Sequence, residues 1–295
     1  MSAFRDWLKS WLPRPVWVLL RRTWSYVRRL GHWTLVLIEV RGDGAREALK
    51  LYLSALAAPV TALRGLDEWG NPVLLFDTRV RVAGSDRFRC RRDSDDLWHV
   101  LPSGQGAVRK ALVERLKPGG VFVDAGANIG AFTVLGARLV GSHGRVVAIE
   151  MMPDTVRRLR DHLELNGLGW VLVVEGALSD IGGRDVVARV PPGLAGQASI
   201  VRTAFAKDDL IEVHVKTTTL DDVVEDLPRL DVLKMDLEGA EALAFDGGRE
   251  TLSRTRCVIF EDWGGRGHGR DAAKRVTGAG FELHRLDGNN MIGVR

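Results

Sequence analysis

Residues 121–130 (VFVDAGANIG) constrain the fold of this chain more than any other stretch. Three apolar residues, two of them β-branched valines, predict a short buried strand that ends at Asp124. The loop after it contains Gly126 and Gly130, and glycine lets a ligand approach the main chain closely. Residues 131–140 predict a helix, whose first N–H groups face whatever lies over the loop. This order indicates a nucleotide-type binding turn; the alternative is an ordinary strand-to-helix turn.

The spacing within the loop indicates which kind of nucleotide it binds. The pattern D-x-G-x-x-x-G differs from the G-x-G-x-x-G that binds a pyrophosphate, and it suits a ligand without phosphates. S-adenosylmethionine is the commonest such nucleotide, and we expect it as the cofactor. Asp124 either engages its methionine ammonium group or fixes the loop by accepting backbone N–H bonds. The residues of this stretch assigned to the cofactor are Asp124, Gly126, Ala127, Asn128 and Gly130.

From residue 121 onward, apolar runs alternate with helical patterns, which is typical of a doubly wound parallel sheet. The expected strands are residues 121–123, 145–149, 170–174, 231–235 and 257–260, followed by a closing antiparallel pair at 281–286 and 291–294. Acids follow the parallel strands: Asp124, Glu150, Glu175, Asp236, and Glu261 with Asp262. Because ligands bind beyond the carboxyl ends of strands in such sheets, we expect these acids along one rim.

Glu150 lies about twenty residues past the glycine loop, where an acid can accept both ribose hydroxyls of a nucleotide. The alternative is a solvated acid at a strand end. The next strand ends in Glu175-Gly176-Ala177, and we assign Gly176 and Ala177 to the cofactor site.

Residues 233–241 (LKMDLEGAE) form the second informative motif. An apolar strand with a lysine and several acids is costly to bury unless the charges are paired. Lys234 can pair with the carboxylates, which is a purely structural role. The functional alternative places Asp236 or Glu238 near the methyl sulfonium, where a carboxylate accepts the proton of an attacking hydroxyl. Asp236 is then both a catalytic and a cofactor-site candidate. Upstream, Thr219 before Leu-Asp-Asp predicts a helix N-cap.

The N-terminal segment differs in composition from the rest of the chain. Residues 1–30 carry seven basic side chains and one acid, which leaves residues 31–295 with a net charge of −2 against +4 for the whole chain. Five of the nine tryptophans occur in residues 1–33. A helix over residues 15–30 would be basic and amphipathic, so residues 5–33 either contact an anionic membrane surface or pack on the main domain. A further helix over 44–58 is expected to end at Pro59, and residues 72–76 and 78–82 to form strands.

Composition limits the compartment and the partners. The only cysteines, Cys90 and Cys257, have no metal-ligand spacing and fit a reducing compartment, so we expect a cytoplasmic protein, with the membrane surface as the alternative. Residues 31–295 lack the net basic charge of a nucleic-acid binder. No stretch reaches the ~20 apolar residues of a membrane span. The sequence does not predict an oligomeric state.

The chain resembles the FkbM family of S-adenosylmethionine-dependent methyltransferases over residues 117–261. The resemblance rests on ordered pieces: VDAGANIG (123–130), VAIE with Pro153 (147–153), Asn166-Gly167, ALSD (177–180), TTLDD (218–222), LKMDLEGAE (233–241) and VIFE (258–261). It implies a class I, Rossmann-like fold with a mostly parallel seven-stranded sheet whose last strand is antiparallel. It also implies O-methylation of a hydroxyl on a sugar, glycan or natural product. Met151 and Met152 depart from the family, which usually has a small or polar pair there; Met151 would then form part of the wall around the ribose and adenine.

An alcohol is a poor nucleophile at neutral pH, so a base or a metal must assist. Asp236 or Glu238 is the metal-free choice. The less favoured alternative is Mg²⁺ held by Asp236, Glu261 and Asp262, an incomplete set of oxygen ligands.

Competing interpretations belong to other classes of protein. A nicotinamide dehydrogenase is disfavoured by the missing G-x-G-x-x-G, and a base methyltransferase by the missing Asn-Pro-Pro-Tyr motif. The non-enzymatic alternative is a membrane-surface scaffold that keeps the fold without turnover. We divide the chain into an N-terminal helical segment, residues 1–59, and a methyltransferase domain, residues 60–295.

Overall fold

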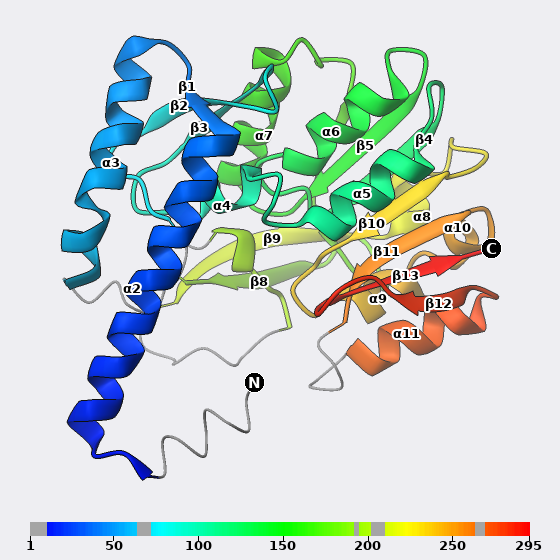
Figure 1. Ribbon diagram of the computed structural model, residues 1–295. Helices are drawn as coiled ribbons and strands as arrows, with labels where there is room; N and C mark the ends of the chain where they lie inside the picture. The colour runs from blue at the N-terminus through cyan, green and yellow to red at the C-terminus, as the bar shows by residue number, and fades with distance from the viewer. Residues whose placement is uncertain (1–10, 64–71, 192–194, 202–209, 263–268) are drawn as a thin grey trace. The chain divides into compact units, whose positions relative to one another are not determined.

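The computed structural model describes residues 11–63, 72–191, 195–201, 210–262 and 269–295 (Figure 1). Its contacts divide the chain into two compact units, Met1–Ser103 and Gly104–Arg295, which are described separately. No helix among the described residues combines the length and the apolar character that a membrane span requires.

The first unit combines helices with a three-stranded antiparallel sheet of order β1-β2-β3. Its described elements are α2 (Arg14–Glu39), β1 (Val40–Gly42), α3 (Ala45–Leu63), β2 (Thr78–Val82), β3 (Asp86–Cys90) and α4 (Asp96–Val100). Along β2 and β3, buried residues alternate with exposed ones, so one sheet face packs inward and the other is solvated. The core takes side chains from both helices and both strands: Trp33, Val36, Leu51, Val80, Phe88 and, from α4, Leu97.

Three expectations for this unit were wrong. α2 extends to Glu39 instead of ending at residue 30, because its C-terminal half buries Trp33 and Val36. α3 continues through Pro59 to Leu63. Residues 72–76 form no strand; the Leu75 N–H donates to the Ser54 hydroxyl (3.0 Å) instead of to a sheet partner.

The domain boundary expected at residues 59 and 60 stays a prediction, and the contacts divide the chain after Ser103. β2 lies beyond residue 60 but pairs with β1, with Val40 opposite Val82. Glu47 of α3 accepts a hydrogen bond from the Arg79 N–H (2.9 Å). These bonds connect residues 78–90 to the N-terminal helices.

The second unit is built on a seven-stranded sheet of order β12-β13-β11-β10-β4-β5-β6. The strands are β4 (Val121–Ala125), β5 (Arg145–Glu150), β6 (Leu172–Glu175), β10 (Val232–Met235), β11 (Cys257–Glu261), β12 (Glu282–Arg285) and β13 (Asn290–Val294). Neighbours from β6 to β11 run parallel, and β13 is antiparallel to both β11 and β12. The prediction of a mostly parallel seven-stranded sheet with an antiparallel last strand is confirmed.

Helices cover both faces of this sheet. They are α5 (Gly106–Arg115), α6 (Ala131–Val140), α7 (Pro153–Leu165), α8 (Leu220–Val223), α9 (Glu241–Asp246), α10 (Arg249–Ser253) and α11 (Gly269–Gly278). Figure 1 shows α5, α6 and α7 on one side and α9 and α11 on the other. Because both faces are covered, β4 and β10 are buried at every residue, which explains their continuous apolar runs. Thr219 caps α8 as predicted, its side chain accepting from the Asp222 N–H (3.1 Å).

A small sheet of order β7-β9-β8 follows β6. Its strands are β7 (Ala177–Leu178), β8 (Asp185–Val190) and β9 (Ile211–Thr218), and the short 3₁₀ helix η2 (Ala195–Gln197) lies between the last two in the chain. Ala188 and Val215 of this sheet pack against Met152 and Ala177. The hairpin is therefore anchored just beyond the carboxyl end of β5.

Candidate active site

The loop between β4 and α6 is a left-handed turn held on the end of β5. Gly126, Asn128 and Gly130 have φ angles of +73, +49 and +91°. The N–H groups of Gly126 and Ala127 both donate to the Ile149 carbonyl oxygen (2.9 and 3.0 Å). Glycine occupies two of the three left-handed positions, since it lacks the Cβ that makes this conformation costly.

Gly126 joins this loop to the second acidic motif. A Cβ on Gly126 would overlap the carbonyl oxygen of Asp236. The Asp236 N–H donates in turn to the Ala125 carbonyl oxygen (3.0 Å). The expected cofactor loop and the expected catalytic acid therefore lie side by side.

Asp124 is fully buried behind the loop. Its Oδ2 accepts from the Thr133 hydroxyl of α6 (2.7 Å), and its Oδ1 lies 3.2 Å from Lys234 Nζ of β10. Asp124 thus connects β4, α6 and β10. Its contact with a cofactor remains a prediction.

Lys234 is buried between two carboxylates, the pairing that the sequence allowed. Its Nζ also lies 3.7 Å from Asp236 Oδ2 and 5.3 Å from the centre of the Phe132 ring. Burial alone would lower the pKa of Lys234, but the Asp124 and Asp236 carboxylates outweigh burial and hold that pKa above its usual value. Lys234 is therefore a fixed positive charge beneath the site.

Glu150 ends β5 with its carboxylate turned onto the loop. Oε2 accepts from the Asn128 N–H and Oε1 from the Met152 N–H, both at 2.9 Å. Burial raises the pKa of Glu150, and these N–H bonds only partly offset that effect. A carboxylate has about four acceptor sites; the Met151 N–H takes a third, so one remains for a ribose hydroxyl.

The remaining residues assigned to the cofactor lie around Glu150. The Gly176 N–H donates to the Glu150 carbonyl oxygen (3.0 Å), and Ala177 begins β7. Met151 is half-buried and packs against the cluster that contains Met152 and Ala177. The Asn128 side-chain oxygen is buried without a hydrogen-bond partner among the described residues.

The turn after β10 presents Glu238. Glu238 itself has a φ of +52°, unusual for a residue with a side chain, and Gly239 has +102°. Glu241 Oε1 stabilises this turn by accepting from the N–H groups of Leu237 (2.8 Å) and Gly239 (3.3 Å). The Ser199 hydroxyl donates to the Glu238 carbonyl oxygen (2.9 Å), which links the turn to the segment before β9.

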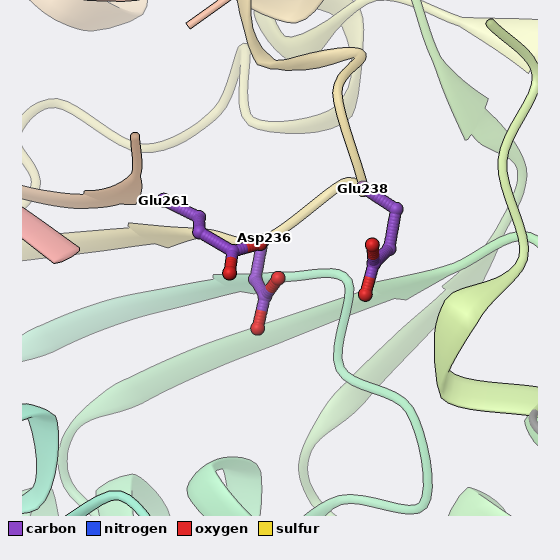
Figure 2. Close-up of side chains that lie close together, drawn as sticks. All are labelled: Asp236, Glu238 and Glu261. Atoms are coloured by element: carbon purple, nitrogen blue, oxygen red, sulfur yellow. The ribbon is translucent and has the colours of Figure 1, made fainter. Parts of the chain in front are cut away.

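Three carboxylates meet at the carboxyl ends of β10 and β11. Figure 2 shows Asp236 and Glu261 adjacent, with Glu238 approaching from the other side. One oxygen of each lies within 4.8 Å of the others. Burial is the main cause that raises the pKa of Glu261 to about 9, and repulsion from Asp236 and Glu238 adds to it. Glu261 is therefore protonated at neutral pH, and a side-chain hydrogen bond with Asp236 favours the same form.

The cluster differs from the ligand set expected for Mg²⁺. Glu238 stands where Asp262 was expected, because Asp262 Oδ2 accepts from the Arg285 guanidinium (3.0 Å). Three carboxylates at this spacing can hold a cation or share a proton. The raised pKa of Glu261 corresponds to the cluster with a proton and without a cation.

Sequence reasoning missed Thr133, Glu241 and Ser199. The sequence contains a usable signal for Thr133, which is a hydroxyl in the first turn of the helix after Asp124. It contains another for Glu241, which is a carboxylate two residues after the glycine of a turn. Ser199 had none, since its contact with Glu238 joins segments far apart in the chain.

The sheet order, the glycine loop and the acids at the strand ends define a class I S-adenosylmethionine-dependent methyltransferase. The family model described as methyltransferase FkbM domain matches residues 124–277, more than half of the chain. The chain belongs to the FkbM methyltransferase family.

Several solved structures are similar to this chain at low identity, and no curated protein sequence matches it. Methyltransferase FkbM from Methylobacillus flagellatus KT is 17% identical, with 68% of this chain and 53% of that chain covered and a TM-score of 0.40. A SAM-dependent methyltransferase from Aquifex aeolicus is 16% identical (68% and 90% covered, TM-score 0.39). Precorrin-6y C5,15-methyltransferase from Geobacter metallireducens GS-15 is 14% identical (64% and 87% covered, TM-score 0.41). At these identities and scores, the likeness carries no information on the substrate.

Proposed function

We propose that this methyltransferase methylates a hydroxyl group and that Asp236 is its general base. The observation that carries the proposal is the position of Asp236, whose backbone touches Gly126 and whose side chain is 31% exposed beside two further carboxylates. A partly exposed carboxylate next to the cofactor loop can both meet a substrate and accept a proton.

The residues around the loop fit S-adenosylmethionine. Gly126 and Gly130 leave the main chain uncovered, and Glu150 has spare acceptor capacity next to it. Asp124, Ala127, Asn128, Met151, Gly176 and Ala177 complete the proposed cofactor site. When bound, S-adenosylmethionine supplies an electrophilic methyl group.

The protein's own contribution is to position the acceptor and to receive its proton. Asp236 Oδ accepts the hydroxyl proton as the oxygen becomes nucleophilic. Glu261, neutral at pH 7, keeps its proton and adds no second negative charge beside Asp236. Lys234 places a positive charge 3.7 Å from Asp236. Glu238 is the second candidate base, since its carboxylate lies in the same cluster.

The acceptor class, a hydroxyl on a sugar, glycan or natural product, rests on the family. The test is transfer of radiolabelled methyl from S-adenosylmethionine to a panel of such hydroxylated compounds. We expect a product whose label survives alkali, because a methyl ether resists hydrolysis and a methyl ester does not. Alkali-labile label, or transfer to amines alone, would contradict O-methylation.

The role of Asp236 is tested by Asp236→Asn in the same assay. We expect kcat to fall by about 10²–10⁴-fold, the usual contribution of a general base, with S-adenosylmethionine affinity unchanged. Asp271→Asn, which alters an exposed acid on α11, is the matched control. Equal rates for both variants would show that Asp236 is not the general base and would favour Glu238 in that role.

A metal-free reaction is part of the proposal. We expect turnover to persist after dialysis against EDTA, because Asp236 supplies the base. Loss of turnover that only Mg²⁺ restores would favour a cation held by Asp236, Glu238 and Glu261 instead. A scaffold without turnover is the remaining alternative, favoured if S-adenosylmethionine binds and no acceptor is methylated.

We further propose a cytoplasmic location at a membrane surface, with the contact made through residues 5–33. Cys90 and Cys257 are both buried and are not joined in a disulfide, which supports a reducing compartment. Residues 5–10 of the proposed contact lie outside the described residues. No nucleic-acid partner is proposed.

A further inference from the structure

Helix α2 has apolar side chains on two opposite faces. Trp33, Val36 and the residue after the helix, Val40, are at most 2% exposed and follow a helical spacing, which places them on the face packed in the first unit. On the opposite face, with only the described residues counted, Val16, Leu20, Trp24, Val27 and Ile38 are between 42 and 65% exposed. Val16, Leu20, Trp24 and Val27 follow one another at three or four residues, and Ile38 follows Val27 after about three helical turns. All five therefore lie on one stripe of the helix. One apolar face is enough to pack a helix on its own unit, so the exposed face is available to a further partner.

Helix α3 repeats this arrangement. Leu51, Ser54 and Ala58 are buried, whereas its exposed large apolar residues lie on the other side of the helix. These are Leu49, Tyr52, Leu53 and Leu56, between 42 and 76% exposed and spaced i, i+3, i+4 and i+7. Figure 1 shows α2 and α3 as the two long helices of this unit. Exposed apolar groups on this scale mark an interaction surface.

The charge on α2 indicates what that surface contacts. Its sequence contains five arginines: Arg14, Arg21, Arg22, Arg28 and Arg29. From Arg14 to Ile38 the helix contains no acidic residue. A second copy of the chain would bring two such basic helices together, which is repulsive. A basic helix with an exposed apolar stripe is typical of one that lies on anionic lipid.

We propose that the exposed stripes of α2 and α3 together dock the protein on an anionic lipid bilayer, with α2 lying in the plane of the headgroups. At about 1.5 Å per residue, its 26 residues extend about 39 Å along such a surface. The inference deepens the proposed membrane location by adding α3 and the charge of the lipid. It does not depend on methyl transfer, because S-adenosylmethionine binding is measured separately without lipid.

The test is co-sedimentation of the full chain with phosphatidylcholine vesicles, with and without phosphatidylglycerol. We expect sedimentation with the anionic vesicles, weaker sedimentation with the neutral ones, and a decrease as salt is raised. The double variant Trp24→Ser, Val27→Ser should bind the anionic vesicles at least about tenfold more weakly, because it removes two large apolar contacts. Leu53→Ser with Leu56→Ser should weaken binding in the same direction, which tests the contribution of α3.

The matched control is Val113→Ser with Leu172→Ser, which removes two apolar side chains of similar exposure from the second unit. It should sediment like the original chain. Circular dichroism and S-adenosylmethionine titration check that each variant is folded. The proposal would be overturned if the original chain did not sediment with anionic vesicles, or if all variants sedimented equally. It would also be overturned if the chain formed a dimer without lipid and the double variant Trp24→Ser, Val27→Ser dissociated that dimer. This last outcome would assign the surface to a second copy of the chain.

Discussion

At the residue scale, Gly126 is where the cofactor loop and the acidic motif touch. Its φ of +73° favours glycine because a residue with a Cβ is strained in that conformation. The Asp236 carbonyl oxygen favours glycine because it occupies the place that a Cβ would take. Gly167 separates the two effects, because it has a similar φ of +67° after the end of α7 and a Cβ added there would have no neighbouring atom within 4 Å.

We therefore expect Gly126→Ala to cost more than Gly167→Ala. The control should cost about 1–2 kcal/mol, the usual penalty of a left-handed alanine. Gly126→Ala should cost more than that and also weaken S-adenosylmethionine binding, since the loop must move away from Asp236. Urea unfolding and calorimetric titration measure the two effects. Equal unfolding free energies with unchanged affinity would show that the close approach is unimportant.

The buried pair of Lys234 and Asp124 makes a second prediction at this scale. Lys234→Met should lower the free energy of unfolding by about 3–5 kcal/mol, because Asp124 is left as an uncompensated buried charge. The double variant Lys234→Met, Asp124→Asn should recover part of that loss, since the buried charge is then absent. A double variant less stable than the single one would show that Asp124 does not depend on Lys234.

At the element scale, the ends of β10 and β11 bring Asp236, Glu238 and Glu261 together, and this has a pH consequence. The pKa of Glu261 is raised from 4.5 to about 9 in the folded protein, so the unfolded chain releases this proton at lower pH than the folded one. The folded state therefore loses relative stability as the pH rises from about 5 to about 9. Below that window both states are protonated, and above it both are ionised.

Glu261→Gln should remove this dependence. We expect the variant to gain stability relative to the original chain between pH 5 and pH 9, by at least about 1.4 kcal/mol, the equivalent of one pKa unit. Urea unfolding at several pH values measures it, with Glu250→Gln on the exposed surface of α10 as the control. A stability difference that stays constant over this range would mean that Glu261 titrates normally.

The same scale shows why the sequence predicted the sheet well and the site only partly. Strands buried on both faces must be apolar throughout, so β4, β5, β10 and β11 are visible as runs that end in acids. The contacts that shape the site are partly local and partly distant. Glu241 holds the Glu238 turn from within the same motif. Ser199 reaches that turn from 39 residues away, and no local pattern encodes such a pairing.

At the scale of the whole molecule, the sequence and the contacts divide the chain at different places. The sequence places the division at residue 59, where the helix over residues 44–58 is expected to end, and that domain division stays a prediction. The contacts place it after Ser103, because β2 and β3 pair with β1. Strand pairing depends on which edge is available in three dimensions, and composition does not report that.

Binding of S-adenosylmethionine to the full chain tests the central claim most directly. Calorimetric titration should show one site per chain. Glu150→Ala should weaken it by about 10–100-fold, because the variant loses the acceptor for the Asn128 and Met152 N–H groups and for the ribose, each bond to a charged group being worth about 1.5–3 kcal/mol. Glu250→Ala should leave the affinity unchanged. No binding by the original chain, or equal affinity for both variants, would contradict the account.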